Sequence, residues 1–390
     1  MREVKLKKTA ERQLSNYCVS LYEKDIETSI KSFVPGEWVK VRGEKLDYVG
    51  FLNPNVNAGP VLRVIKEFVD RESAEEIISK LLDEALRRRQ RFKRYTNYRL
   101  CYGDADLLPG LIIDVFENYV LIQINTAGID SHREFIKHKI EEMYKEKKVV
   151  LFDNESYRKN EVLPTFENIS IDQVEINESD FKYVIEGETI QKIGYYFDHR
   201  ENRLKLERFL KDISPLESGV DLFSYVGSWG LHMLRGGVQN VEFVDQANMQ
   251  KNITKSLELN ELEDRGTFTR KDVFSFLDQC LQKNKKFDII VSDPPAFSKS
   301  EKNIKKALGG YEKLHFKSMN ILNDEGYYIA ASCTHGVSVE DLDQTVLKAS
   351  KRLGKRVQLL DIGVQGWDHP FESLGSKAFY IKYLLYQVYK

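Results

Sequence analysis

The chain has 390 residues, which suggests two or three domains. Its hydrophobic content of 42% and charged content of 31% are those of a globular protein with a large core, and no apolar run is long enough to span a bilayer. Four cysteines (Cys18, Cys101, Cys280 and Cys333) are scattered without a Cys-x-x-Cys pair, which argues against a disulfide framework or a zinc site. The N-terminal residues lack the apolar segment of a signal peptide, so we expect a cytoplasmic protein without a metal or a membrane partner.

The net charge of −1 predicts no partner, but the charge is unevenly distributed. Residues 1–100 contain 21 Lys and Arg against 15 Asp and Glu, whereas the remaining residues contain 38 against 45. A basic front part on an acidic body indicates that the front part contacts a polyanion.

The first 70 residues indicate a small β module. Strands are expected after the turn at 33–36, at 49–52 and at 61–65, separated by turns rich in Gly, Asn and Pro.

A helix is then expected from Ser73, whose side chain can cap it, and Glu75 and Glu76 suit its first turn. This helix leads into residues 87–99, the densest basic run of the chain, in which aromatic residues are interleaved. Basic side chains bind phosphates and aromatic rings stack on unpaired bases. The alternative is a solvated helix terminus, where cations suit the helix dipole. The candidate RNA-binding residues are Arg87, Arg88, Arg89, Arg91, Lys93, Arg94 and Tyr95.

Residues 71–187 indicate a central α/β domain. A hairpin is expected at 108–124, a helix at 133–144, a strand at 148–152 and further short strands at 166–186. From residue 188 the pattern changes: an amphipathic helix is expected at 204–210, and strands then alternate with helices to the end of the chain. Such alternation predicts a Rossmann-like, doubly wound parallel sheet that binds ligands at the carboxyl ends of its strands.

The stretch 219–230 organises this last domain. A short apolar strand passes through Asp221 and ends in a turn with Gly227 and Gly230, after which a helix begins. Such a turn lets a ligand approach the backbone and directs a helix N-terminus at it. By itself the pattern fits a nucleoside site, a dinucleotide site or a plain tight turn.

Acidic residues recur at the ends of four successive strands, at Asp221, Asp245, Asp272 and Asp293. No Gly-Lys-Ser/Thr loop is present to bind a triphosphate. Several acids without a phosphate-binding cation favour a nucleoside cofactor with a positive centre, and S-adenosylmethionine fits this better than NAD. The alternative for each acid alone is a helix cap or a turn former.

Cys333 follows the fifth strand, at the same edge of the predicted sheet. Its thiolate could attack C6 of a pyrimidine and make C5 a nucleophile for a methyl group. The alternative is an inert core cysteine.

Taken together, these motifs resemble the class I S-adenosylmethionine-dependent RNA methyltransferases. More narrowly, they resemble the bacterial family that makes 5-methylcytosine in large-subunit ribosomal RNA and carries an N-terminal PUA domain. The stretches that carry the resemblance are Leu108–Asp114, Gly194–Arg203, Asp221–Gly227, Asp293–Pro295 with Phe297, and Ser332–Thr334.

The resemblance implies a PUA-like RNA-binding module at 1–70, a central α/β domain at 71–187 and a methyltransferase domain at 188–390. It implies that Cys333 is the nucleophile and that Asp293 contacts the target base. It also implies a set of cofactor-binding residues: Phe197, Asp198, Arg200, Asp221, Phe223, Gly227, Asp245, Gln246, Asp272, Val273 and Asp293.

Three alternatives remain. A methyltransferase acting on a base amino group typically has an aromatic residue directly after Asp-Pro-Pro, whereas Ala296 stands here and Phe297 comes one residue later. An RNA-binding ribosome assembly factor without catalysis would bind RNA in a salt-dependent way. An NAD-dependent oxidoreductase is disfavoured because Tyr225 occupies the place of its first glycine. The sequence leaves open the base that removes the C5 proton, the target nucleotide and whether the protein is a homodimer.

Overall fold

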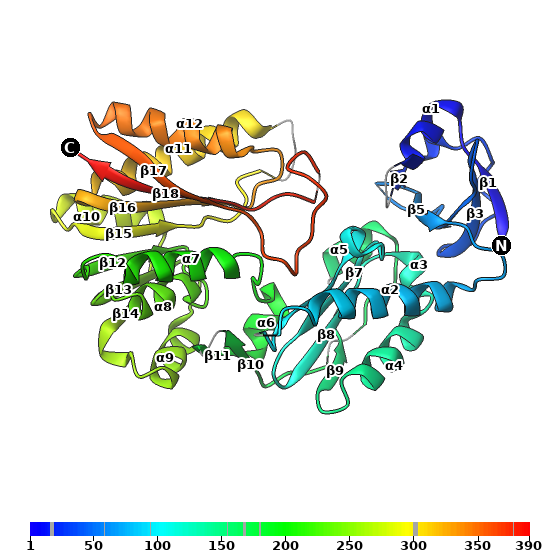
Figure 1. Ribbon diagram of the computed structural model, residues 1–390, viewed down its shortest axis with the longest axis horizontal. Coiled ribbons are helices and arrows are strands. Elements are labelled where there is room, and N and C mark those ends of the chain that lie inside the picture. The colour runs from blue at the N-terminus through cyan, green and yellow to red at the C-terminus, as the bar shows by residue number, and fades with distance from the viewer. Residues whose placement is uncertain are drawn as a thin grey trace. The chain divides into compact units, whose positions relative to one another are not determined.

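The computed structural model describes residues 1–15, 19–57, 59–93, 95–153, 155–166, 169–178, 181–298, 303–376 and 378–390 (Figure 1). The chain forms two compact units. Unit 1 comprises 1–180, 186–194 and 367–370, and unit 2 comprises 181–185, 195–366 and 371–390.

Unit 1 begins with a five-stranded sheet in the order β1-β3-β4-β5-β2. The parallel pair β1 and β3 is followed by antiparallel pairings. Its strands are β1 (Arg2–Lys5), β2 (Val19–Leu21), β3 (Glu37–Arg42), β4 (Tyr48–Leu52) and β5 (Leu62–Glu67). The short helices α1 (Lys8–Glu11), η1 (Arg12–Ser15) and η2 (Glu23–Asp25) lie between β1 and β3 in the chain. The expected β module is therefore confirmed, and Val4, Val39, Val41 and Leu62 are among its fully buried core residues.

The second sheet of unit 1 has four strands in the order β6-β7-β8-β9. They are β6 (Tyr98–Tyr102), β7 (Leu111–Val115), β8 (Tyr119–Ile124) and β9 (Lys148–Leu151). Helices α2 (Ala74–Arg89) and α4 (Arg133–Met143) contact each other and this sheet (Figure 1). The remaining elements are η3 (Gly103–Asp106), α3 (Ala127–Asp130), α5 (Glu155–Asn160), β10 (Gln173–Glu178) and α6 (Gly187–Ile193).

The helix expected after Ser73 is confirmed, including its cap. Ser73 Oγ accepts a hydrogen bond from Glu76 N, and the Glu76 carboxylate accepts one from Ser73 N. This reciprocal pair satisfies two of the N–H groups that a helix start leaves open.

Unit 2 contains a seven-stranded sheet in the order β14-β13-β12-β15-β16-β18-β17. Its strands are β12 (Ser218–Leu222), β13 (Asn240–Asp245), β14 (Gly266–Arg270), β15 (Phe287–Ser292), β16 (Leu322–Ser332), β17 (Arg356–Gly363) and β18 (Lys382–Tyr389). The helices are α7 (Arg200–Lys211), α8 (Ser228–Arg235), α9 (Gln250–Leu259), α10 (Val273–Gln282), α11 (Ile304–Asn320) and α12 (Val339–Arg352), with the short η4 (Glu263–Arg265). Strand β11 (Phe181–Glu186) runs from unit 2 into unit 1.

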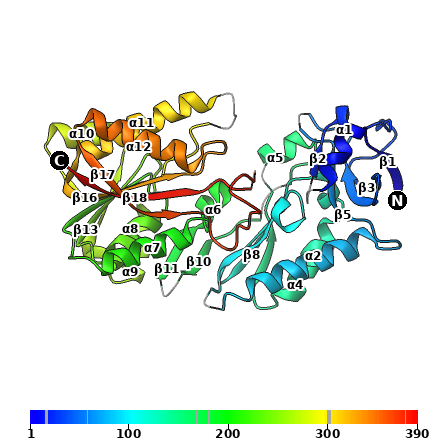
Figure 2. The same cartoon turned by 45° about the horizontal axis from the view of Figure 1, so that its top comes forward.

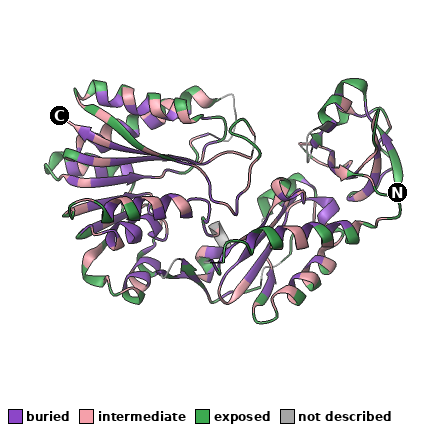
Figure 3. Ribbon diagram, viewed as in Figure 1, coloured by how far each residue is buried: buried purple, intermediate pink, exposed green. Residues whose placement is uncertain are grey.

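The five strands from β14 to β16 are parallel, and helices cover both faces of the sheet (Figures 1 and 2). The central strands β12, β15, β16 and β18 are largely buried, whereas the edge strands β14 and β17 are not (Figure 3). The chain order reverses between β12 and β15, which makes the carboxyl ends of these strands the expected ligand site. Among the described residues, no helix combines the length and hydrophobicity needed to cross a membrane.

The doubly wound parallel sheet is confirmed for β12 to β16, but the last strands differ from the expectation. Strand β18 inserts between β16 and β17 and is antiparallel to both. The helix expected at 204–210 begins earlier, at Arg200, because the polar residues 200–203 already form its first turn.

Candidate active site

The loop between β12 and α8 has an unusual backbone. Phe223, Tyr225 and Gly227 have φ angles of 62°, 48° and 84°. The first two are bulky side chains in the left-handed region that favours glycine, which costs of order 1–3 kcal/mol each. Strain of this kind collects at ligand sites, so the predicted cofactor residues Phe223 and Gly227 lie in a loop with the expected character.

Asp221 lies in β12, one residue before the strand ends at this loop, and is completely buried. One carboxylate oxygen accepts a hydrogen bond of 2.8 Å from Gly230 N, and the other has no hydrogen-bond partner. Burial, together with the neighbouring Asp293 and Asp245, raises the pKa of Asp221 to about 8, although the hydrogen bond from Gly230 N acts to lower it. An orphaned buried oxygen amid other acids is the setting that a cationic ligand group would complete.

Asp245 connects two loops. Its carboxylate accepts hydrogen bonds from Tyr225 N at 2.9 Å and from Ala247 N at 2.8 Å. The side chain is only partly buried, so both oxygens keep lone pairs for a further donor such as a ribose hydroxyl. The adjacent Gln246 is exposed.

Asp272 is exposed and caps helix α10. Its side chain accepts hydrogen bonds from Ser275 N at 2.9 Å and from Ser275 Oγ at 3.0 Å. The helix-cap alternative is therefore correct for this residue, and its role in cofactor binding stays a prediction. Val273 is buried in the core beside the sheet.

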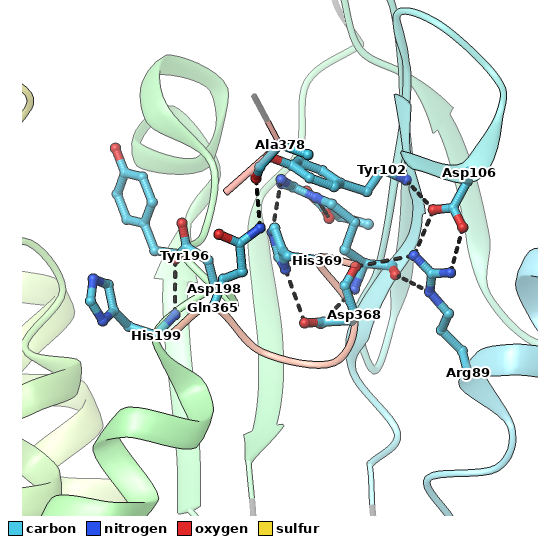
Figure 4. A network of polar contacts seen from close by, with 12 residues as sticks. Arg89, Tyr102, Asp106, Tyr196, Asp198, His199, Gln365, Asp368, His369 and Ala378 are labelled. Carbon is cyan, nitrogen blue, oxygen red and sulfur yellow. Dashed lines mark hydrogen bonds and ion pairs between the residues drawn. The ribbon is translucent and has the colours of Figure 1, made fainter. Parts of the chain in front are cut away.

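Asp198 is held from three directions within unit 2. Its carboxylate accepts a hydrogen bond of 2.7 Å from Tyr380 Oη and one of 3.0 Å from His199 N. Its carbonyl accepts one of 2.8 Å from Gly366 N. Figure 4 shows Asp198 beside Gln365, whose Nε2 donates a hydrogen bond to the carbonyl of Ala378. The segment before β18 thus fixes this predicted cofactor residue.

The two other predicted residues of this motif, Phe197 and Arg200, are buried and contact each other. The Arg200 guanidinium lies 4.8 Å from the centre of the Phe197 ring. Their roles at the cofactor stay predictions.

Asp293 follows β15 and is fixed by two aromatic residues. Trp229 Nε1 donates a hydrogen bond of 2.9 Å to one carboxylate oxygen, and His199 Nε2 lies 3.6 Å from the other. Asp293 is partly exposed, so it stays available to a ligand.

Cys333 is only partly buried, in contrast to Cys101 and Cys280, while Cys18 lies outside the described residues. Its Sγ lies 3.8 Å from the carbonyl of Pro294, next to Asp293. The parallel pairing of β15 with β16 causes this meeting, because Ser292 is opposite Ala330 and both strands end at the same edge. Burial, together with the charges of Asp293 and Asp198, raises the pKa of the Cys333 thiol to about 12, although Lys382 acts to lower it.

The candidate RNA-binding run divides into buried and exposed residues. Arg89 is 2% exposed and forms a bidentate pair with Asp106, with two bonds of 2.6 Å (Figure 4). Arg88 also donates to Asp106, at 2.9 Å. The RNA-binding prediction is therefore wrong for Arg89, since its guanidinium is used inside unit 1.

Tyr95 requires the same correction. It is 6% exposed and stacks on Trp367 at 5.3 Å between ring centres, beside Phe92, which stacks on the same ring at 4.2 Å. The cations that remain exposed and described are Arg87, Arg91 and Lys93, with Arg88 exposed but paired. Arg94 lies outside the described residues.

Sequence reasoning missed three residues near the carboxyl ends of the strands in unit 2. Trp229 stands inside the glycine turn, where only the glycines were considered. Lys382 is the first residue of the antiparallel strand β18, and Tyr380 lies in the segment before it. No sequence motif marks either residue.

No family model matches the chain, but it has relatives among known proteins. A ribosomal RNA large subunit methyltransferase I from Aeromonas salmonicida is 30% identical over 297 residues, which cover 74% of each chain. A protein of the same name from Pseudoalteromonas translucida is 32% identical over 302 residues, which cover 75% of each chain.

Solved structures share the fold. A protein from Streptococcus mutans that is described as a SAM-dependent methyltransferase superposes with a TM-score of 0.79 at 20% identity over 99% of this chain and 100% of the other. A methyltransferase solved in complex with SAH superposes with a TM-score of 0.78. At the identity and coverage of its sequence relatives, the chain belongs to the ribosomal RNA large subunit methyltransferase I family.

Proposed function

We propose that this protein transfers the methyl group of S-adenosylmethionine to C5 of a cytosine in large-subunit ribosomal RNA, with Cys333 as the covalent nucleophile. The relatives' names support the reaction class and the RNA, since both are called ribosomal RNA large subunit methyltransferases. The choice of C5 rests on Cys333.

The acidic edge of the sheet supports the methyl donor. Asp221, Asp245 and Asp293 act on one another electrostatically, and one oxygen of Asp221 is buried without a partner. S-adenosylmethionine carries an ammonium and a sulfonium and, when bound, supplies an electrophilic methyl group. Asp221 would hold the positive methionine end and Asp245 the ribose hydroxyls. A phosphate-bearing cofactor would instead place negative charge against these acids.

The meeting of Cys333 with the Asp293–Pro294 turn is the observation that carries the proposed chemistry. The Cys333 thiolate would form a bond to C6 of the cytosine, and the electron pair would move to C5. C5 would then bond to the donated methyl group, and the C5 proton would pass to a base. Loss of that proton would return the electron pair, break the C6–S bond and release the thiolate.

The first 100 residues, which belong to unit 1, support an RNA substrate through their excess of basic side chains. We propose that its five-stranded sheet is a PUA-like module and that the exposed cations Arg87, Arg91 and Lys93 bind RNA phosphates. Such contacts add affinity without reading sequence.

The test is methyl transfer from labelled S-adenosylmethionine to undermethylated large-subunit RNA, with the product nucleoside identified by mass spectrometry. Wild type is compared with Cys333→Ala and with Cys280→Ala, a matched control because Cys280 is a buried core residue of α10. We expect 5-methylcytosine from wild type and from the control. We expect Cys333→Ala to lose activity by more than about 10³-fold while it still binds the cofactor.

Two results would contradict the proposal. A different methylated nucleoside, or full activity in Cys333→Ala, would make Cys333 a core residue and remove the assignment to C5. Cofactor binding without methylation of any RNA would favour a binding factor.

A further inference from the structure

Lys382 is a buried lysine at the carboxyl edge of the sheet. It is the first residue of β18, lies directly opposite Ser332 of β16 and is 1% exposed. Lysine is almost never fully buried unless its charge has a partner. Its position therefore needs an explanation beyond packing.

The contacts of its ammonium group are neutral. Nζ donates hydrogen bonds of 2.8 Å to the carbonyl of Thr334 and of 2.8 Å to the carbonyl of Tyr380. Both of these hydrogen-bond partners are carbonyls rather than carboxylates, and an ammonium has three donors. The positive charge is thus held against the residue that follows Cys333, without a carboxylate to neutralise it.

The charges around Cys333 make this placement informative. Asp293 and Asp198 oppose ionisation of the thiol, and Lys382 is the cation that favours it. The Tyr311 phenol also lies near Cys333, and Asp341 acts on Lys382 from helix α12. Burial lowers the pKa of Lys382 to about 8, although Cys333 and Asp341 act to raise it.

We propose that Lys382 is a positioning residue that activates Cys333, its buried ammonium stabilising the thiolate form of the nucleophile. The inference rests on the proposed role of Cys333 and adds the group that makes its thiolate accessible. The two carbonyl contacts fix Nζ beside the strand end that carries Cys333. The competing explanation is that Lys382 only ties the Thr334 and Tyr380 carbonyls together.

The test is the pH dependence of Cys333 alkylation by iodoacetamide, measured by mass spectrometry of the Cys333 peptide. Wild type is compared with Lys382→Met, which removes the charge and retains the length of the side chain, and with Lys382→Arg, which retains the charge. We expect Lys382→Met to raise the alkylation midpoint by at least about one pH unit, and so to slow the reaction at pH 8 about tenfold. We expect Lys382→Arg to restore most of the rate.

An unchanged midpoint in folded Lys382→Met would overturn the inference. Circular dichroism and the low reactivity of the buried Cys280 report on folding. If Lys382→Met does not fold, the reciprocal measurement decides, because coupling between two groups acts equally on both. The pKa of Lys382, followed by NMR of ¹³Cε-labelled lysine, should fall in Cys333→Ser, and an unchanged pKa would refute the coupling.

These measurements need no RNA, so they separate the two proposals. A shifted alkylation midpoint together with a product other than 5-methylcytosine would retain the Lys382 inference and reject the assignment to C5. An unshifted midpoint together with 5-methylcytosine would do the reverse.

Discussion

Two buried aspartates, Asp106 in unit 1 and Asp221 in unit 2, have opposite surroundings although neither is exposed. Asp106 accepts three hydrogen bonds from the guanidinium groups of Arg88 and Arg89 and one from Tyr102 N. Asp221 accepts one from a backbone N–H, and its second oxygen has none.

The difference separates structural from functional polar groups. A buried charge that is paired and fully hydrogen-bonded helps to specify a fold, and Arg89 extends the pair further by donating to the carbonyls of Arg99 and Asp368. A buried acid that is left half-satisfied is costly, and it persists where a ligand completes it. The same residue type thus marks a structural junction in one unit and a candidate ligand site in the other.

The largest expected effect is on stability, from Asp106→Ala. Two guanidinium groups would lose their carboxylate, one of them in a buried position, and breaking such a pair costs about 3–5 kcal/mol. Denaturant unfolding, followed through hydrogen exchange in unit 1, measures the loss. The control Asp104→Ala changes a neighbouring exposed aspartate and should cost under about 1 kcal/mol. Equal effects of the two variants would show that the Asp106 network is not special.

A smaller effect, on cofactor affinity rather than on stability, is expected for Asp221→Asn. Above a pH of about 8, where the wild-type carboxyl is ionised, the amide still accepts from Gly230 N but cannot pair with a cation, so affinity for S-adenosylmethionine should fall about 10- to 100-fold by calorimetry. Stability should not fall. The control is Asp288→Asn, since Asp288 bonds the backbone of Glu217 and Ser218 at the other edge of the sheet. That variant should lose stability and keep its affinity, and the comparison fails if both variants behave alike.

The pH dependence of stability tests whether Asp221, unlike the paired Asp106, is buried without a partner for its charge. Because burial raises the pKa of Asp221 to about 8, the native state keeps a proton that the unfolded chain releases above a pH of about 4. The native state therefore loses stability as pH rises between these values. Asp221→Asn cannot titrate, so its unfolding free energy relative to wild type should increase from pH 4 to pH 8 without cofactor. A difference that does not change with pH would mean that Asp221 is ionised normally.

The smallest effect is expected at the exposed part of the basic run. Arg91→Ala and Lys93→Ala should each weaken RNA binding about threefold at moderate salt and reduce the salt dependence by about one released counterion. Fluorescence anisotropy with labelled RNA over a salt series measures both quantities. Lys283→Ala removes an exposed cation of unit 2 and is the control. If it reduces the salt dependence equally, the basic run is not the RNA-binding surface.

Local patterns in the sequence determined much of the fold. Alternation of short apolar strands with amphipathic helices predicted the doubly wound sheet, which β12 to β16 form. The capping box at Ser73 was readable because its two partners are three residues apart. Strand-end acids were readable too, because parallel strands bring their carboxyl ends to one edge.

Only the tertiary structure decided how the polar residues are used. The basic run gave no sign that Arg89 pairs with Asp106, because a buried and an exposed arginine look alike in a sequence. Lys382 carried no motif, since its nearness to Cys333 arises from antiparallel insertion of β18 beside β16, two strands separated by about fifty residues of chain. Local patterns determine which elements form, whereas long-range pairing determines which side chains meet.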